Sequence, residues 1–230
     1  MPEQIANWYT APVDHISSND DGHSQVCYSQ EGEDMLLYEL LGHLDIGFYV
    51  DIGAHHPKRY SNTHFFYKKG WRGINADAMP ESMKEFNIHR PNDINVEVGL
   101  ASKQENLIFY VFNEAGLNTF DQVRAKEISQ LPDYFIVKEV LVRTITFAHL
   151  MAEYLPDGVD IDFLSIDIEG LDYEVLKSND WNKYRPRIIL VEHYLVDFIE
   201  VLRCDIYLFL TNNGYNLTAK TYRNLIFTRK

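Results

Sequence analysis

Four acidic residues occupy the same kind of position in this chain, at the end of an apolar run. They are Asp51, Asp77, Asp167 and Glu192. In an alternating α/β chain the carboxyl ends of parallel strands meet at one edge of the sheet, where ligands bind. One acid in such a place often caps a helix or lies in solvent. Four of them in step indicate a polar site that can bind hydroxyl groups or a cation.

The turn after the first of these acids narrows the choice of ligand. In Asp51-Ile-Gly-Ala-His-His56 the single glycine, Gly53, lets the backbone approach a ligand closely. A dinucleotide site has the pattern G-x-G-x-x-G, whose backbone N–H groups bind the pyrophosphate. This chain lacks that pattern, so a cofactor without phosphates fits better, and S-adenosylmethionine is one. Asp77 has the spacing of an acid that binds ribose hydroxyls.

Strands alternate with helices along the chain, and this order would position the acids. Apolar runs and alternation predict strands over 48–51, 71–77, 94–100, 107–112, 137–145, 160–167, 187–192, 215–219 and 224–228. Helical spacing predicts helices over 34–44, 62–69, 80–88, 120–130, 147–154 and 197–210, and another that begins at 173. We therefore expect a doubly wound α/β sheet, mostly parallel, with an antiparallel C-terminal hairpin. We predict a flexible N-terminal arm over residues 1–26 and a single domain over 27–230.

Composition excludes several classes of protein. Of the 230 residues, 46% are hydrophobic and 24% charged, which is ordinary for a globular protein with a sizeable core. The net charge of −13 argues against a nucleic-acid backbone as partner. No apolar run is long enough for a membrane span, and the N-terminus is unlike a signal peptide. Cys27 and Cys204 match no metal spacing, so we expect free thiols in a cytoplasmic protein.

Several motifs in a fixed order resemble the FkbM family of methyltransferases, from about residue 28 to the C-terminus. They are Tyr28-Ser-Gln-Glu-Gly-Glu-Asp34, Gly47-Phe-Tyr-Val-Asp-Ile-Gly-Ala-His-His-Pro57, Ser61-Asn-Thr63, Tyr67-Lys-Lys-Gly-Trp-Arg-Gly-Ile-Asn75, Asp77-Ala-Met-Pro80 and Phe163-Leu-Ser-Ile-Asp-Ile-Glu-Gly170. The resemblance implies a class I, Rossmann-like methyltransferase fold with a seven-stranded sheet whose last strand is antiparallel. It also implies S-adenosylmethionine as cofactor. The expected reaction is O-methylation of a sugar hydroxyl, on a nucleotide sugar or a glycan, in polysaccharide or glycoconjugate synthesis.

The resemblance also implies which residues bind the cofactor. Asp51 and Gly53 match the first cofactor motif, and Asp77 matches the ribose-binding acid. The wider family often has Glu at that position, and the shorter side chain of Asp reaches less far. Glu97, after the third strand, would lie beside the adenine. Gln30 belongs to a segment that we expect to close over the cofactor as a lid.

Methyl transfer to a hydroxyl needs a group that takes up its proton, or a metal that lowers its pKa. His193, Asp167 and Glu169 are the candidate catalytic residues, because each lies just past a strand end. A histidine in this place can equally well bond a backbone carbonyl. Asp167, Glu192 and His193 match the metal-ligand positions of catechol-type methyltransferases, so a divalent metal is a less favoured alternative. We expect His56 and Glu192 to contact the substrate.

Two other groups of polar residues have simpler explanations. His55, His56 and His64 lack the spacing of a metal site, and no carboxylate or cysteine completes one. A basic stretch is either a solvated face or a contact for a substrate phosphate. Its residues are Lys58, Arg59, Lys68, Lys69 and Arg72.

Three further functions stay open from the sequence. N-methylation of an amine or phosphoramidate would use the same cofactor site. A binding module that has lost catalysis would keep the scaffold alone, although the intact acids argue against it. A nicotinamide dehydrogenase fits poorly without the glycine-rich turn. The expected partner is a small carbohydrate, and the aromatic content of 15 Tyr and 13 Phe leaves room for a homodimer.

Overall fold

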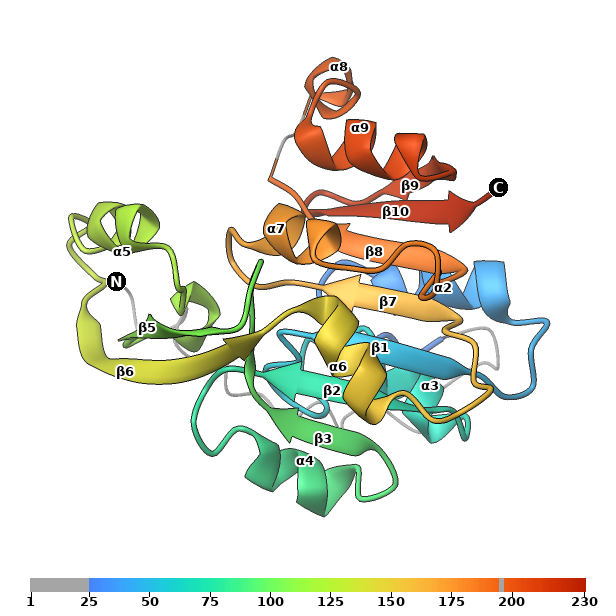
Figure 1. Ribbon diagram of the computed structural model, residues 1–230, viewed down its shortest axis with the longest axis horizontal. Coiled ribbons are helices and arrows are strands. Elements are labelled where there is room, and N and C mark those ends of the chain that lie inside the picture. The colour runs from blue at the N-terminus through green and yellow to red at the C-terminus, as the bar shows by residue number, and fades with distance from the viewer. Residues whose placement is uncertain (1–24, 195–196) are drawn as a thin grey trace.

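A computed structural model describes residues 25–194 and 197–230 and has a seven-stranded sheet at its centre (Figure 1). The strand order is β3-β2-β1-β7-β8-β10-β9. Five strands are parallel to their neighbours: β1 (Phe48–Ile52), β2 (Arg72–Asp77), β3 (Ile94–Glu97), β7 (Phe163–Ile166) and β8 (Ile188–Glu192). β10 (Asn224–Arg229) is antiparallel to both β8 and β9 (Tyr215–Lys220). The predicted doubly wound, mostly parallel sheet with an antiparallel C-terminal hairpin is confirmed.

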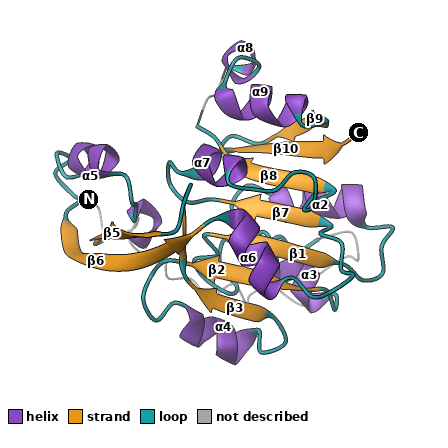
Figure 2. Ribbon diagram, viewed as in Figure 1, coloured by secondary structure: helices purple, strands orange, loops and turns teal. Residues whose placement is uncertain are grey.

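Helices cover both faces of the sheet (Figure 2), and alternate residues of the central strands pack against them. Val50 and Leu164 face one layer, formed by α6 (Phe147–Tyr154), α7 (Asp172–Lys177) and α9 (Asp205–Asn212). Tyr49 and Phe163 face the other, formed by α2 (Glu33–Leu41) and α3 (His64–Lys68). A further helix, α4 (Met83–His89), lies between β2 and β3 in the chain. Because both faces are covered, the central strands are continuous apolar runs.

The strand predicted over 94–100 is wrong, because the chain changes sheet within it. β3 ends at Glu97, and β4 (Gly99–Leu100) pairs instead with β6 (Ile136–Ile145) in a second sheet. The crossing is tight at Gly99, where a Cβ atom would lie 2.6 Å from Phe120 Cζ. Glycine therefore permits the step from one sheet to the other.

The single helix predicted over 197–210 is also wrong, since two helices occupy this range. They are α8 (Phe198–Val201) and α9. Cys204 lies between them, and its Sγ accepts a hydrogen bond from Tyr207 N at 3.4 Å. This capping contact begins a new helix where the apolar spacing alone indicated a continuous one.

The second sheet extends beyond the carboxyl edge of the first, at the left of Figure 1. Its order is β4-β6-β5, and β5 (Glu105–Phe112) and β6 form a long antiparallel hairpin. A short 3-10 helix, η1 (Ala115–Leu117), and α5 (Gln122–Ile128) connect these strands. Ala125 and Ile128 of α5 pack against Tyr110 and Phe112. We call residues 105–145 the hairpin arm.

Several expectations concern the chain ends and the cellular setting. Most of the predicted N-terminal arm, residues 1–24, lies outside the described residues, and the single domain over 27–230 stays a prediction. Cys27 and Cys204 are both free thiols. None of the helices in the described part of the chain is long and apolar enough to cross a membrane.

Candidate active site

The turn after β1 passes very close to the end of β7. Gly53 has a φ of +78°, and a Cβ atom there would lie 1.7 Å from the carbonyl oxygen of Asp167. The N–H groups of Gly53 and Ala54 both donate to the Ala76 carbonyl, at 2.9 and 3.2 Å. The turn is therefore fixed between the ends of β2 and β7, and glycine is what permits so close an approach to the Asp167 carbonyl.

Asp77 ends β2, and its carboxylate fixes two neighbouring turns. Oδ2 accepts from His55 N at 2.8 Å, and Oδ1 accepts from Met79 N at 2.7 Å. Burial raises the pKa of Asp77, and these two N–H groups oppose that shift. The side chain is half-buried, and each oxygen has a second lone pair for a further donor. Ribose binding by Asp77 fits this geometry and stays a prediction.

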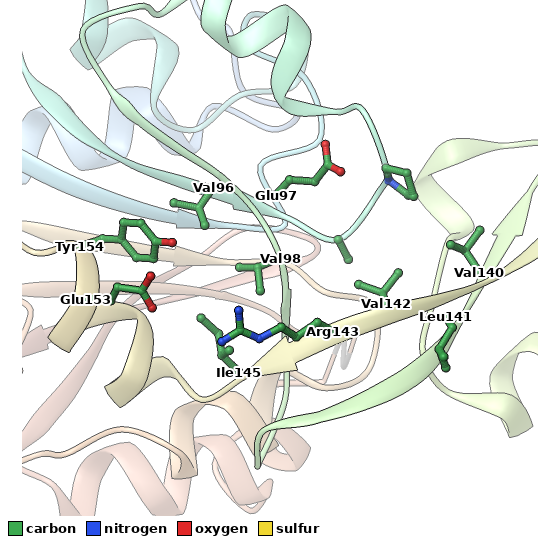
Figure 3. Close-up of a pocket in the computed structure, with 12 residues that line it drawn as sticks. Val96, Glu97, Val98, Val140, Leu141, Val142, Arg143, Ile145, Glu153 and Tyr154 are labelled. Atoms are coloured by element: carbon green, nitrogen blue, oxygen red, sulfur yellow. The ribbon is translucent and has the colours of Figure 1, made fainter.

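A cavity of about 270 Å³ opens beside Glu97, between the strand ends and the hairpin arm (Figure 3). Val98 and Val142 give it apolar walls, while Glu97, Arg143 and Glu153 are its charged residues. Glu97 is exposed, and its Oε2 accepts from Glu81 N at 2.7 Å. A concave site that combines apolar walls with a few polar groups is typical of small-molecule binding. The position predicted for Glu97, beside an adenine, stays a prediction.

Asp51, near the end of β1, is buried beside the turn. Only 5% of it is exposed, and its Oδ2 accepts from Thr63 Oγ1 at 2.8 Å. Thr63 Oγ1 in turn accepts from Arg90 Nη1 at 2.7 Å. The fully buried Arg90 also donates to the Pro57 carbonyl and to Ser61 Oγ, both at 2.7 Å. Burial raises the pKa of Asp51, against the opposing effects of Thr63 and Arg90. Direct contact of Asp51 with a cofactor stays a prediction.

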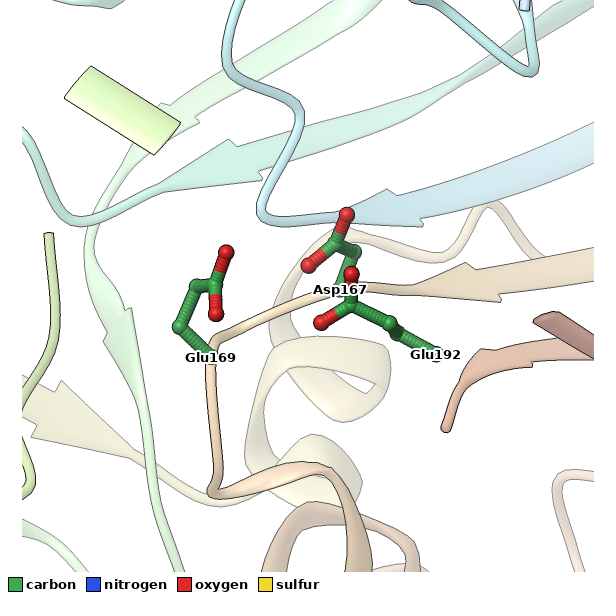
Figure 4. A group of neighbouring side chains, drawn as sticks. All are labelled: Asp167, Glu169 and Glu192. Carbon is green, nitrogen blue, oxygen red and sulfur yellow. The ribbon is translucent and has the colours of Figure 1, made fainter. Parts of the chain in front are cut away.

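Three carboxylates gather at the ends of β7 and β8 (Figure 4). Asp167, Glu169 and Glu192 each place an oxygen within 4.8 Å of the other two. We call them the carboxylate group. Burial raises the pKa of all three, and repulsion by Glu192 raises those of Asp167 and Glu169 further, the latter to about 7. Such a group favours the uptake of a proton or the approach of a cation.

The backbone at Glu169 is held in an unusual conformation. Glu169 has a φ of +54°, which is uncommon for a residue other than glycine. Asp172 accepts from the N–H groups on either side, of Ile168 and Gly170, both at 3.2 Å. Burial raises the pKa of Asp172 to about 6. Left-handed residues fixed in this way are concentrated at functional sites, so the turn fits a role in chemistry.

The hairpin arm reaches the carboxylate group through residues that the sequence analysis did not select. Arg124 of α5 forms an ion pair with Glu169 through Nη2 and Oε2. Its guanidinium lies over the ring of Tyr194, 5.4 Å from the centroid. Tyr194 OH donates to Glu169 Oε2 at 3.3 Å, and Thr119 Oγ1 donates to the Glu169 carbonyl at 3.0 Å. The arm therefore contacts both the side chain and the backbone of Glu169.

The carboxylate group contains neither of the two predicted histidines. His193 follows Glu192, its backbone N–H donates to the Arg223 carbonyl at 2.6 Å, and burial lowers its pKa. Within the described residues, the group that could hold a metal contains Glu169 where the prediction named His193. His56 Nδ1 accepts from the backbone N–H of Lys58 and Arg59, each at 3.0 Å. Its proton is therefore on Nε2, which remains available as a donor.

The segment around Gln30 lies against the closing hairpin of the sheet. Glu31 Oε2 accepts from Arg223 N at 3.0 Å, and Glu33 Oε1 accepts from Asn224 Nδ2 at 2.9 Å. Gln30 itself, just before these two anchors, is exposed. The segment is thus held at residues 31 and 33, and both its closure as a lid and the contact of Gln30 with a cofactor stay predictions.

The basic stretch is used largely for packing on aromatic rings. Lys69 Nζ lies 4.6 Å from the centroid of Tyr38, and Arg72 lies 5.0 Å from that of Tyr67. Lys68 Nζ donates to Tyr28 OH at 2.7 Å. These contacts favour a structural role for this stretch over a phosphate site.

The order of the sheet, with one antiparallel strand next to its edge, defines the class I methyltransferase fold. The family model described as the methyltransferase FkbM domain matches residues 51–217. The chain belongs to this family and is an S-adenosylmethionine-dependent methyltransferase, as the motifs predicted.

Solved structures similar to this chain are also methyltransferases. A candidate RNA methyltransferase from Pyrococcus horikoshii has a TM-score of 0.45 at 10% identity, over 90% of this chain and 91% of that chain. A TehB-like S-adenosylmethionine-dependent methyltransferase from Corynebacterium glutamicum has 0.42 at 11%, over 99% and 97%. Precorrin-6y C5,15-methyltransferase from Geobacter metallireducens has 0.43 at 13%, over 94% and 97%. No curated protein sequence matched.

Proposed function

We propose that the protein transfers the methyl group of S-adenosylmethionine to a hydroxyl of a sugar, on a nucleotide sugar or a glycan. One observation carries the proposal. The Gly53 turn, which belongs to the cofactor motif, meets the carbonyl of Asp167, and Asp167 belongs to the carboxylate group. Cofactor and proton-accepting groups would therefore be neighbours. A hydroxyl acceptor needs both, because it must be aligned with the methyl group and lose its proton.

The β1–β2 end of the sheet suits this cofactor. Gly53 lets the turn pass against the end of β7, which a residue with a Cβ atom could not do, and Asp77 has lone pairs for the ribose hydroxyls. The cavity beside Glu97 would receive the adenine. S-adenosylmethionine supplies an electrophilic methyl group on a positively charged sulfur, which the acidic edge of the sheet would attract.

The carboxylate group would bind the acceptor and take its proton. Glu169, whose pKa lies at about 7, has the acidity of an effective general base near neutral pH. Asp167 and Glu192 are close enough to accept hydrogen bonds from other hydroxyls of the same sugar. His193 and His56 would contribute at the rim of the site, His56 through its Nε2–H. The geometry favours a carboxylate over His193 as the base.

Calorimetry and a screen test the proposal separately. S-adenosylmethionine and S-adenosylhomocysteine should give binding heat and a thermal shift, while NAD should give neither. Nucleotide sugars and short glycans, incubated with protein and cofactor, should then yield one product that is heavier by one methyl group in mass spectra. Absence of any heat or thermal shift with both adenosyl compounds would remove the proposal.

N-methylation of an amine is the second candidate. Three carboxylates facing one another would attract an ammonium group at least as well as they accept a hydroxyl proton. Amino sugars in the same screen test it. Fragmentation of the product shows whether the new methyl group is on nitrogen or oxygen.

A divalent metal in the carboxylate group would be an alternative way to activate the hydroxyl. Oxygen ligands from Asp167, Glu169 and Glu192 suit Mg²⁺ or a similar hard cation. Arg124 already places a positive charge against Glu169, so we expect full activity in excess EDTA. Loss of activity in EDTA that Mg²⁺ restores would support the metal instead.

A further inference from the structure

We propose that Arg124 is a positioning residue, which holds Glu169 for the acceptor and makes the hairpin arm part of the acceptor site. The proposal rests on the methyl transfer proposed above. It assigns a role in the reaction to a segment that the cofactor motifs do not include.

The contacts of Glu169 distinguish its two carboxylate oxygens. Oε2 accepts both from Arg124 Nη2 and from Tyr194 OH. Among the hydrogen bonds of the described residues, none is made to Oε1. The pair of donors therefore fixes the rotation of the carboxylate and leaves Oε1 as the oxygen that can accept the hydrogen of an acceptor hydroxyl.

The arm also fixes the backbone that carries this carboxylate. Thr119 Oγ1 of the arm donates to the Glu169 carbonyl at 3.0 Å, and Glu169 has a φ of +54°. A side chain on such a turn points where its neighbours hold it, because its backbone conformation is an uncommon one. Arg124 and Thr119 belong to the same arm, so one segment sets both the position and the direction of Glu169.

The kind of cation matters as much as its charge. The side chains of Arg124 and Glu169 are 27% and 15% exposed, so the pair lies mostly out of solvent. The planar guanidinium stacks on Tyr194, whose hydroxyl donates to the same oxygen. A lysine would keep the charge but lose the flat group that stacks. We therefore expect Lys at this position to restore only part of the function.

The test uses Arg124→Gln and Arg124→Lys in the full chain, with Lys126→Gln as control, because Lys126 is exposed on the same helix. Arg124→Gln should lower kcat for the acceptor roughly 100-fold, since misplacing a reacting group by about 1 Å has that effect. The Kd for S-adenosylmethionine by calorimetry should stay within about threefold, because none of the described hydrogen bonds or ion pairs of Arg124 is made to a predicted cofactor residue. The kcat of Arg124→Lys should lie between those of Arg124→Gln and the unchanged protein. The kcat of Lys126→Gln should equal that of the unchanged protein.

Two results would overturn the proposal. One is a kcat for Arg124→Gln within about threefold of the unchanged protein, well short of the effect of misplacement. The other is a loss of cofactor affinity that accounts for the whole loss of activity, since that would indicate general damage to the fold.

A double-mutant cycle of Tm values tests the Arg124–Glu169 contact independently of the proposed methyl transfer. If Arg124 and Glu169 act as a unit, Arg124→Gln combined with Glu169→Gln should change Tm no more than the larger single change. Additive changes would mean that the two side chains act independently, and the inference would fail whatever the reaction. If the protein binds S-adenosylmethionine and methylates nothing, while the cycle is non-additive, the proposed reaction fails but the Arg124–Glu169 unit stands.

Discussion

Two neighbouring parts of one sheet edge hold their acids in different surroundings: the carboxyl ends of β1 and β2, here the β1–β2 end, and those of β7 and β8, here the β7–β8 end. At the β1–β2 end, Asp51 and Asp77 accept hydrogen bonds from the turns around them, and no other carboxylate contacts theirs among the described hydrogen bonds. At the β7–β8 end, Asp167, Glu169 and Glu192 face one another, and an arginine from a distant segment balances them. The acids are similar in type and in place, but their surroundings differ.

This difference separates binding from proton handling. Backbone N–H groups stabilise a carboxylate in its charged form, which is the form that accepts ribose hydroxyls. Burial, together with repulsion by Glu192, makes Glu169 hold a proton more readily and raises its pKa to about 7. The β1–β2 end therefore suits the binding that we propose for it, and the β7–β8 end suits the uptake of a proton.

The largest effect on cofactor binding is expected from Gly53→Ala. Its affinity for S-adenosylmethionine should fall at least roughly 100-fold, which corresponds to about 2.7 kcal/mol of binding free energy. The new Cβ would lie 1.7 Å from the Asp167 carbonyl oxygen, so the turn after β1 and the end of β7 would be pushed apart. Calorimetry measures the loss.

Gly158→Ala is the matched control for this clash. Gly158 has a φ of +74°, close to that of Gly53, but a Cβ there would meet nothing within 4 Å. It should lower Tm through backbone strain and leave cofactor affinity unchanged. Normal affinity in Gly53→Ala would show that the close contact does not shape the cofactor site.

At the β7–β8 end, Glu169→Gln should lower kcat by about 10²–10⁴-fold, the range typical of a general base. His193→Ala should lower kcat by less than about tenfold, because His193 lies outside the carboxylate group. Steady-state rates with a saturating acceptor decide between them. A larger loss in His193→Ala than in Glu169→Gln would reverse the assignment and return the base to the histidine.

At the β1–β2 end, Asp77→Asn should weaken S-adenosylmethionine roughly 10- to 100-fold, as expected for lost hydrogen bonds to a charged group. The rate at saturating cofactor should barely change, since Asp77 contacts no residue of the carboxylate group in the described hydrogen bonds. Separate measurement of KM and kcat checks this. A fall in kcat with an unchanged KM would contradict the division between the two ends.

The smallest effect concerns stability and pH. The pKa values of Glu169 and Asp172 are raised to about 7 and about 6, so the folded protein binds protons that the unfolded chain releases. Their contribution to the free energy of unfolding should therefore fall as pH rises from about 4.5 to 7. Urea unfolding at pH 5.5 and at pH 7.5 gives the free energy of unfolding at each pH. The difference between the two values should be smaller by roughly 1 kcal/mol in Glu169→Gln. The same difference in that variant as in the unchanged protein would contradict the raised pKa.

Much of the main sheet was predictable from local pattern. The four apolar runs before the strand-end acids are all strands in the structure, because strands covered on both faces are apolar throughout. β1, β2 and β8 include Asp51, Asp77 and Glu192, and β7 ends one residue before Asp167. The split at Gly99 was not predictable. Alternation in residues 94–100 is the same whether a strand pairs with β2 or with β6, and β6 begins some forty residues later.

The site was predictable only in part, for a similar reason. Acids at strand ends meet at one edge by topology, so their neighbourhood follows from the strand pattern. Arg124 is 45 residues from Glu169, and it reaches that acid only because the hairpin arm folds back over the edge. Arg90 lies 27 residues from Thr63 and has no spacing that links it to Asp51. Contacts made by packing leave no periodic signal in the sequence.

The close packing of Phe120 at Gly99 bears on how an acceptor enters and leaves the site. Phe120 lies against the backbone at Gly99, and Arg124, four residues later in the same arm, pairs with Glu169. These two contacts hold this part of the arm against the site. We therefore expect the acceptor to enter and leave alongside the arm, so that the width of this passage limits which acceptors fit.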